Sequence, residues 1–473
     1  MNTLEGKECY KELHRPQFHF TAKKDWINDP NGLVYHKGEY HLFFQHSPGF
    51  LTHAPNSWGH AISKDLLHWK QMEHAIEPDE YGFIWSGSAV VDWNNTSGLQ
   101  NGNEAVIVAI YTTGGFGYNP NPCVQAIAYS NDCGRTFTKY PKHILGHICA
   151  ENRDPKVIWH KQSGKWIMAL YLEGDIFSLF GSKDLKRWDR LCDLELGGTG
   201  ECPDIFELPV DGDTTNTRWV LWSAAGTYQI GTFDGNIFTP ETRTLKAELG
   251  PNGYAAQTWS NLPVEDDRTI QISWMINGNY PYMPFNQQMS FPVEISLNNT
   301  LDGLRLFRVP IRELQSLRNL EHRWHNYTLK PGYNRREIFK KYGPSWQEVF
   351  PKINTNLIID TNWDLFEIKA EIEFVDTAIF GAIIHGNHLC YEIENNRFTY
   401  LEREILAECQ NRKLQFQILV DRTSLELFVS GGRISASFCF LPKPHYTPIE
   451  FFASGGSVRI ISLTIFELAS TWV

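Results

Sequence analysis

Three short motifs place acidic side chains at widely separated points of the 473-residue chain. They are Asn28-Asp29-Pro30-Asn31-Gly32, which follows Trp26, then Arg153-Asp154-Pro155, and finally Glu201-Cys202-Pro203-Asp204. Paired carboxylates beside aromatic residues are typical of glycoside cleavage. In that reaction one ionised carboxylate attacks the anomeric carbon, while the other, kept protonated by its neighbours, donates to the leaving oxygen. A third carboxylate can hold sugar hydroxyls and favour the charged transition state.

Each motif also has a simpler interpretation. Asp-Pro and Asn-Gly are good turn formers, a surface Arg–Asp contact contributes little, and Glu201 alone could be an exposed loop carboxylate. The combination is more specific. Carboxylates that converge repel one another and destabilise the fold, so such an arrangement indicates a function. No Gly-rich phosphate loop, zinc-protease motif or nucleophile elbow competes with this interpretation.

A weak internal repeat indicates how these acids could be brought together. Apolar runs follow turn signals at fairly regular intervals, which is typical of β-hairpins. We interpret the runs as the inner strands of successive sheets, at residues 40–44, 105–111, 166–171, 219–222 and 270–274. An Asp-centred turn followed by an aromatic alternates with them, as in Ser63-Lys64-Asp65 with Trp69. Further copies centre on Asp132, Asp184 and Asp234.

The repeat predicts an all-β chain whose residues 1–300 form a five-bladed β-propeller. In a propeller the three acidic motifs would meet at one end of the central channel. Residues 301–325 read as a linker with a short helix. Period-two alternation after it, in residues 366–374, 414–420 and 424–429, predicts a C-terminal β-sandwich over residues 326–473. Ordinary hairpins in some other sandwich remain an alternative.

Composition narrows the class of protein. Lys and Arg number 43 and Asp and Glu 54, giving a net charge of −11, which argues against general nucleic-acid binding. No stretch is long and apolar enough to span a membrane. No secretory signal is readable, and the nine cysteines are an odd number without a CxxC pair. We therefore expect a cytoplasmic protein with reduced thiols, although sequons at Asn94, Asn298 and Asn326 leave secretion open.

Taken together, the motifs resemble glycoside hydrolase family 32, the β-fructosidases that include invertases, levanases and exo-inulinases. The resemblance runs in order along nearly the whole chain. It rests on residues 26–32, Trp58-Gly-His-Ala-Ile-Ser63, Trp85-Ser-Gly-Ser-Ala-Val90, Arg153-Asp-Pro155, Glu201-Cys202, Tyr254-Ala-Ala-Gln-Thr-Trp-Ser-Asn261 and Asp421-Arg-Thr-Ser-Leu-Glu-Leu-Phe428. Any one of these motifs is weak, whereas the ordered set is highly specific.

The resemblance implies a role for each site residue. Asp29 would be the nucleophile, Glu201 the general acid/base, and Asp154 the group that binds fructose hydroxyls and stabilises the transition state. The positions that match the fructose pocket are Trp26, Asn28, Gln45, Trp85, Ser86 and Arg153. The implied reaction retains configuration and releases terminal β-D-fructofuranosyl residues from sucrose, fructo-oligosaccharides or fructans. No metal or organic cofactor is expected, since acid–base chemistry suffices.

The chain departs from the family pattern beside the expected pocket. His53 and Gly278 stand where many relatives carry Trp, and Met283-Pro-Phe-Asn-Gln-Gln-Met289 replaces a common Pro-Thr-Ser-Pro-Trp run. These differences leave the three acids untouched and fall on the aromatic wall beside the fructose site, on which substrate preference depends. The alternatives are fructosyl transfer from the same covalent intermediate, cleavage of arabinan or xylan, and a lectin-like propeller without activity. A monomer or homodimer is expected, with the sandwich chiefly structural or a dimer contact.

Overall fold

The computed structural model describes residues 9–54, 56–115, 120–149, 152–198, 200–263, 265–331, 343, 356–376, 379–442 and 449–472. The chain divides into two compact units. The first comprises Met1–Ser316 and Thr471–Val473, and the second comprises Leu317–Ser470. Both consist mainly of β-strands, and the residues Arg312–Leu317 form the 3-10 helix η1. A search of those residues finds no helix with the length and apolarity of a membrane span.

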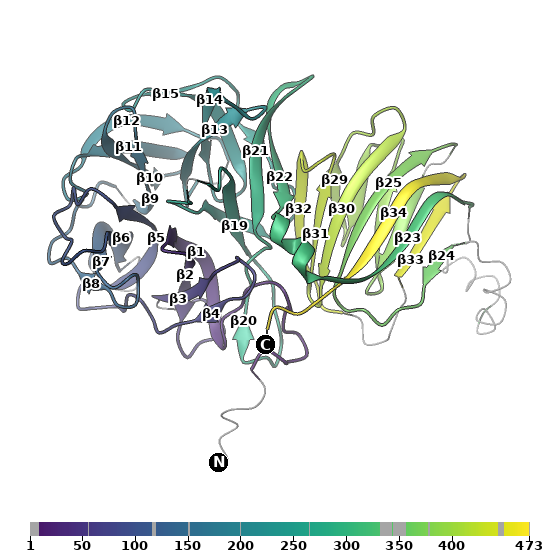
Figure 1. Cartoon of the computed structure of the whole chain (residues 1–473), viewed down its shortest axis with the longest axis horizontal. Coiled ribbons are helices and arrows are strands. Elements are labelled where there is room, and N and C mark those ends of the chain that lie inside the picture. Colours follow the sequence, from purple (N-terminus) through teal and green to yellow (C-terminus); the bar gives the residue numbers. More distant parts are fainter. Residues whose placement is uncertain are drawn as a thin grey trace, which may run out of the picture. The chain divides into compact units, whose positions relative to one another are not determined.

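The strands of the first unit form four hydrogen-bonded sheets (Figure 1). The first has β1 (Asp25–His36), β2 (Glu39–Ser47), β3 (Ser57–Ser63), β4 (Lys70–Gln71) and β20 (Phe285–Asn286). The second has β5 (Phe83–Asp92), β6 (Val106–Gly114), β7 (Val124–Ser130) and β8 (Thr138–Lys139). The third has β9 (Arg153–His160), β10 (Lys165–Glu173), β11 (Ile176–Ser182) and β12 (Asp189–Glu195).

The fourth sheet is larger and continuous. It contains β13 (Asp204–Val210), β14 (Asp213–Trp222), β15 (Thr227–Phe233), β16 (Phe238–Pro240), β17 (Leu245–Lys246), β18 (Gly253–Thr258), β19 (Thr269–Met275), β21 (Val293–Thr300) and β22 (Gly303–Pro310). A single parallel residue pair, Val210 with Leu297, joins its two halves. Because the halves share one sheet, the count of five blades stays a prediction.

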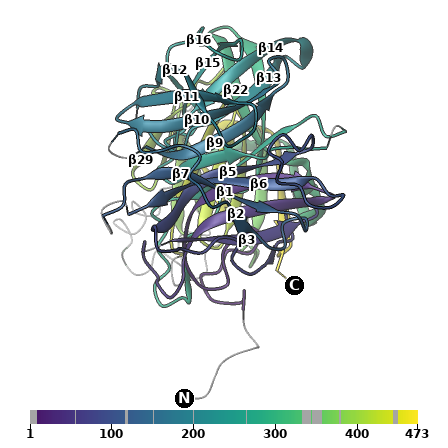
Figure 2. The ribbon, with the colours of Figure 1, turned by 90° about the vertical axis from the view of Figure 1, so that its left-hand side faces the viewer.

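The first strands of the sheets form a closed ring. β1 contacts β5, β5 contacts β9, β9 contacts β13, β13 contacts β18, and β18 contacts β1 again. Figure 2 shows β1, β5 and β9 side by side. In Figure 1 the later strands of each sheet lie farther from this centre. Residues that start these strands are therefore brought together, although they are far apart in the sequence.

The position predicted for the apolar runs is wrong. The runs belong to the second strand of each sheet, in β2, β6, β10, β14 and β19. A second strand is paired on both edges and covered on both faces, so its sequence is continuously apolar. The ring-lining strands instead carry buried polar groups. Lys156, for example, donates from Nζ to the Thr258 carbonyl (2.7 Å) and pairs with Asp204 (3.3 Å).

The Asp-centred turns are confirmed. They lie between the third and fourth strands of their sheets, and one carboxylate oxygen of each Asp accepts two backbone N–H groups at 2.7–3.0 Å. The aspartates are Asp65, Asp132, Asp184 and Asp234. The following aromatic packs inward: the ring of Phe137 meets that of Phe43, in the neighbouring sheet, at 5.4 Å. The turns thus fix the outer edges while their aromatics fill the space between sheets.

The second unit contains two six-stranded sheets. One has β23 (Arg318–Leu329), β25 (Phe366–Phe374), β30 (Lys413–Asp421), β31 (Ser424–Val429), β32 (Ile434–Cys439) and β34 (Val458–Leu468). The other has β24 (Leu357–Ile359), β26 (Ile379–Ile384), β27 (Asn387–Glu392), β28 (Arg397–Tyr400), β29 (Arg403–Leu406) and β33 (Ile449–Ser454). Rings from the two sheets meet, as Phe380 does with Phe416 at 6.0 Å, so the sheets form a sandwich.

Two details of the sequence prediction can be compared with these strands. The strands predicted at 366–374 and 424–429 coincide with β25 and β31. The segment 301–325, predicted as a linker with a short helix, contains β22, η1 and the start of β23. The helix is present, but most of the segment is hydrogen-bonded into sheets.

Candidate active site

A cavity of about 200 Å³ lies in the first unit where the ring strands begin. Every site residue predicted from the sequence lines it except Trp26. The lining residues are Asn28, Asp29, Gln45, His53, Trp85, Ser86, Arg153, Asp154, Glu201, Tyr254 and Trp274. The three acids therefore meet in one place, as the repeat predicted.

Each ring strand contributes to the site. Asp29 lies in β1, Ser86 in β5, Asp154 in β9 and Tyr254 in β18, while Glu201 precedes β13. The Asn28–Gly32 motif, whose simpler interpretation was a turn, is part of β1. The pairing of β1 with β2 is irregular on both sides of it, between Ile27 and Pro30 and between Asn31 and Val34. Such bulges bend a strand and re-aim its side chains.

The backbone at two of the acids is strained. Asp154 has φ = 63°, Glu201 has φ = 147°, and Cys202 has φ = 43°. Non-glycine residues seldom occupy these conformations, which cost free energy and persist only where the surroundings enforce them. The Asp154 backbone is held in this conformation by a hydrogen bond in which its N–H donates to Thr112 Oγ1 at 3.0 Å. Strain concentrated on candidate catalytic residues is consistent with a functional site.

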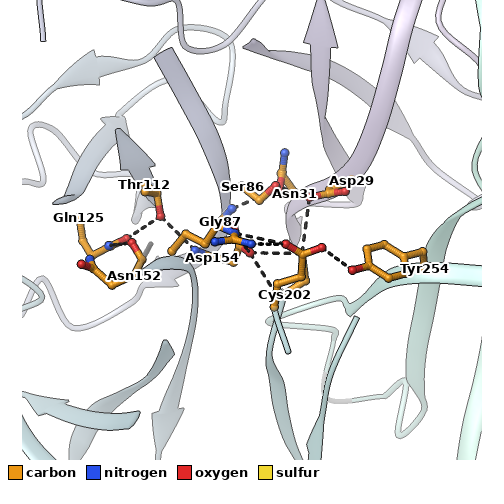
Figure 3. A network of polar contacts seen from close by, with 12 residues as sticks. Asp29, Asn31, Ser86, Gly87, Thr112, Gln125, Asn152, Asp154, Cys202 and Tyr254 are labelled. Atoms are coloured by element: carbon orange, nitrogen blue, oxygen red, sulfur yellow. Dashed lines mark hydrogen bonds and ion pairs between the residues drawn. The ribbon is translucent and has the colours of Figure 1, made fainter. Parts of the chain in front are cut away.

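Asp29 is held by short side-chain donors. Ser86 Oγ donates to Asp29 Oδ2 at 2.6 Å, and Cys202 Sγ lies 3.5 Å from the same oxygen (Figure 3). Burial raises the pKa of Asp29, the hydrogen bond from Ser86 opposes that shift, and the charge of Glu201 adds to it. Because both donors meet Oδ2, they fix the orientation of the carboxylate.

Asp154 is buried beside the other two acids. Its Oδ2 accepts from the Cys202 N–H (3.1 Å) and lies 3.4 Å from Cys202 Sγ. Burial raises the pKa of Asp154 to about 7; Arg153 opposes the shift, and the charges of Glu201 and Asp29 increase it. Burial also raises the pKa of the Cys202 thiol, so the thiol stays neutral and can donate to either aspartate.

Glu201 is anchored at both oxygens. Arg153 Nη2 donates to Oε2 at 2.6 Å, and the Tyr254 hydroxyl donates to Oε1. The Arg153 guanidinium also lies 3.5 Å from Asp154 through Nε and over the ring of Tyr171 at 4.7 Å. One arginine therefore contacts two of the three acids.

Gln45 presents free polar atoms to the cavity. It is 1% exposed, and neither its Oε1 nor its Nε2 has a hydrogen-bond partner among the described residues. A buried amide without partners is costly. In a cavity of this kind the cost is relieved when a ligand supplies hydroxyl groups, which both accept and donate.

The structure adds three residues that the sequence prediction did not assign to the site. Tyr254 lies edge-on to Trp274 at 6.1 Å. Its signal in the sequence was the segment 254–261, whereas Trp274 was hidden in an apolar run. His53, noted as a departure from the family pattern, is stacked on Trp85 at 6.1 Å and 19°. These rings form an aromatic wall beside the acids.

Trp26 supports the wall without lining the cavity. Its Nε1 donates to Asn28 Oδ1 at 3.2 Å, and its ring meets Trp274 at 6.2 Å. Trp26 was predicted to contact the sugar directly, but it is not among the residues that line the cavity. Trp26 is well placed to orient Asn28 and Trp274.

Known proteins share this architecture. Residues 19–310 match the family model of the glycosyl hydrolases family 32 N-terminal domain, and residues 356–467 match that of the family 32 C-terminal domain. The chain is 37% identical to a levanase of Bacillus subtilis, covering 98% of this chain and 72% of that protein. It is 35% identical to an invertase of Debaryomyces hansenii, covering 98% and 95%.

Solved structures agree. The exo-inulinase of Aspergillus awamori superimposes with a TM-score of 0.84 at 26% identity, over 98% of this chain and all of that one. A fructofuranosidase from Schwanniomyces occidentalis in complex with fructose gives 0.83 at 25% identity. The fold is thus the propeller followed by a sandwich that these enzymes share. With two family models matched in order and the acids assembled in one cavity, the chain belongs to glycosyl hydrolase family 32 and is a glycoside hydrolase.

Proposed function

We propose that this chain hydrolyses terminal β-D-fructofuranosyl residues of fructans, fructo-oligosaccharides and sucrose by double displacement. The observation that carries the proposal is the meeting of Asp29, Asp154 and Glu201 in one small cavity whose other walls are polar and aromatic. The relatives support the substrate class, since they are named levanase, exo-inulinase and invertase.

In the first half-reaction Asp29 attacks the anomeric carbon of the fructosyl unit and forms a covalent ester. Ser86 and Cys202 both contact Oδ2, so we assign the attack to Oδ1. The bond to the leaving oxygen breaks as Glu201 transfers its proton to that oxygen. Glu201 is then a carboxylate and takes a proton from water, whose oxygen displaces Asp29 and releases fructose.

The remaining polar groups bind and orient the sugar. Asp154, Asn28 and Gln45 line the cavity on sides formed by β9, β1 and β2, where they can meet ring hydroxyls. A hydrogen bond from a hydroxyl to the Asp154 carboxylate strengthens as positive charge develops on the sugar, which lowers the barrier. Arg153 fixes the spacing of Asp154 and Glu201.

The test is to incubate the protein with sucrose, inulin and levan and to identify the products over time. Free fructose as the first small product is expected, and longer oligosaccharides from concentrated sucrose would instead assign fructosyl transfer. Asp29→Ala and Glu201→Ala should each lower kcat by several orders of magnitude while unfolding at nearly the same temperature. Absence of fructose from all three substrates, or arabinose release from arabinan, would overturn the proposal.

A further inference from the structure

A second cluster of reactive side chains lies at the other end of β1 from Asp29. His36 is the last residue of β1, Glu104 precedes β6, and Cys133 is in the turn between β7 and β8. One imidazole nitrogen, one carboxylate oxygen and the thiol sulfur lie within 4.8 Å of one another. In the part of the chain that the structure describes, no other group of three such side chains meets this condition.

His36 supplies an independent indication of a ligand. It is 1% exposed, and neither Nδ1 nor Nε2 has a hydrogen-bond partner among the described residues. A buried imidazole is nearly always bonded through at least one nitrogen, because leaving both without a partner is costly. One of these nitrogens lies within 4.8 Å of a Glu104 carboxylate oxygen and of the Cys133 sulfur, so the three groups are close enough to share one ion.

The donor set selects a class of cation. Thiolate and imidazole ligands favour zinc over calcium and magnesium, which prefer oxygen. Ligand atoms on one tetrahedral zinc ion lie about 3.3–3.8 Å apart. Because the three atoms lie within 4.8 Å of one another, side-chain rotations that close a pair by at most about 1.5 Å complete the geometry. We propose that His36, Glu104 and Cys133 bind a zinc-class divalent cation, with water as the fourth ligand.

The site would act as a structural link between two sheets. His36 belongs to the sheet of β1–β4, whereas Glu104 and Cys133 flank strands of the sheet of β5–β8. An ion pair between Arg135 Nη2 and Glu39 Oε2, at 2.6 Å, links the same two sheets. His36 lies seven positions after Asp29 in β1, at most about 23 Å along the strand at the usual rise, so the cation would leave the active-site chemistry unchanged.

Lys37 is the competitor for this site. Its ammonium group pairs with the Glu104 carboxylate, and its side chain is 51% exposed. A bound cation must displace that ammonium group, which is free to swing into solvent. Removing the charge should therefore strengthen cation binding. Asn is the suitable replacement, since Lys37 has φ = 48° and Asn tolerates that conformation.

The experiment is a titration of the chelator-treated full chain with Co²⁺, followed by displacement with Zn²⁺. We expect one equivalent of Co²⁺ to produce a thiolate-to-cobalt charge-transfer band, and Zn²⁺ to remove that band and raise the unfolding temperature. Cys133→Ser should abolish the band, Glu104→Gln should weaken binding about tenfold or more, and Lys37→Asn should tighten it about threefold.

Because the chain has nine free cysteines, the matched control is Cys409→Ser, which removes a partly exposed thiol in the second unit and should leave the band intact. Fructose release should be the same with and without Zn²⁺, so failure of this site would not affect the proposed hydrolysis. The inference is overturned if no stoichiometric band forms, or if the band survives in Cys133→Ser.

Discussion

Asp154 is the site carboxylate whose charge changes near neutral pH. Burial, with the charges of Glu201 and Asp29, raises its pKa from the ordinary value of 3.8 to about 7. Between about pH 4 and pH 7 the folded chain therefore keeps a proton that the unfolded chain has released. The free energy of unfolding then falls as the pH rises, by up to about 1.4 kcal/mol per pH unit.

The substitution Asp154→Asn removes this titration and keeps the shape of the side chain. We expect its unfolding temperature to exceed that of the unsubstituted chain at pH 8, with the difference shrinking as the pH approaches 4. Fructose release should fall strongly at every pH. Thermal unfolding followed from pH 4 to pH 8 checks this, and a difference that does not vary with pH would contradict the raised pKa.

Thr112 positions Asp154 without touching the cavity. Its Oγ1 accepts from the Asp154 N–H at 3.0 Å and donates to Gln125 Oε1 at 2.7 Å, and Gln125 in turn donates to the Asn152 carbonyl (Figure 3). Thr112→Val keeps the shape but leaves a buried N–H and a buried amide oxygen unsatisfied, each at a cost of about 1–3 kcal/mol. The strained backbone of Asp154 loses its restraint.

We expect Thr112→Val to lower kcat about tenfold with a smaller change in KM, since the effect acts through the position of Asp154. The neighbouring Thr113 is the control, because its buried Oγ1 has no hydrogen-bond partner in the described structure. Thr113→Val should leave kcat and stability unchanged or slightly improved. Equal effects of the two substitutions would assign Thr112 a merely structural role.

At the scale of elements, the bulged part of β1 depends on Gly32. This residue has φ = +55°, and a Cβ there would lie 2.6 Å from the Phe43 ring and 2.9 Å from the Trp58 ring. Gly32→Ala should therefore lower the free energy of unfolding for two reasons. Overpacking against the two rings costs about 1–3 kcal/mol, and the strained backbone costs roughly another 1–2 kcal/mol.

Gly164 is a matched control for that substitution. It has φ = +62°, and a Cβ there would meet nothing within 4 Å, so Gly164→Ala should cost the backbone strain alone. Denaturant unfolding of the two variants gives the comparison. Because Gly32 lies three residues from Asp29, only Gly32→Ala should also slow fructose release, and equal losses of stability would show that the packing around β1 adapts.

The sequence predicted the strands better than their places in the sheets. Residues 366–374 and 424–429 alternate with period two, and they form β25 and β31. The apolar face of β25 is buried while most of its other face is partly exposed, whereas every residue of β31 is buried. The most apolar runs were placed on the axis, yet the axis is lined by strands that carry Lys156, Asp204 and Asn31. Hydrophobicity reports burial on two faces, not proximity to an axis.

The acids were predictable because each sits in a distinctive local motif. Tyr254 and Trp274 were not assigned, since an isolated Tyr before Ala-Ala and a Trp in an apolar run look like core residues. Their place in the cavity follows from the contacts of β18 and β19 with β1, which join distant parts of the chain. Such contacts leave little signal in a single sequence.

On the scale of the whole molecule, the first unit is built from both ends of the chain. The chain leaves this unit at Ser316 and returns to it at Thr471. The returning segment is well anchored: Thr471 N–H donates to the Gln17 carbonyl and Trp472 Nε1 to the Pro16 carbonyl, both at 2.8 Å. The Trp472 ring is stacked on Tyr10 at 4.0 Å.

We therefore expect Trp472→Ala to destabilise the first unit by about 1–3 kcal/mol, below the usual cost of a fully buried Trp because the side chain is partly exposed. Trp472→Phe should recover the stacking but not the hydrogen bond, and so give an intermediate value. Thermal inactivation of fructose release follows the first unit, because every residue that lines the cavity belongs to it. The inactivation midpoint should be highest for the unsubstituted chain, lower for Trp472→Phe and lowest for Trp472→Ala. An unchanged midpoint in Trp472→Ala would mean that the returning segment does not stabilise the first unit. The contacts that hold the catalytic ring together would then all lie within residues 9–316.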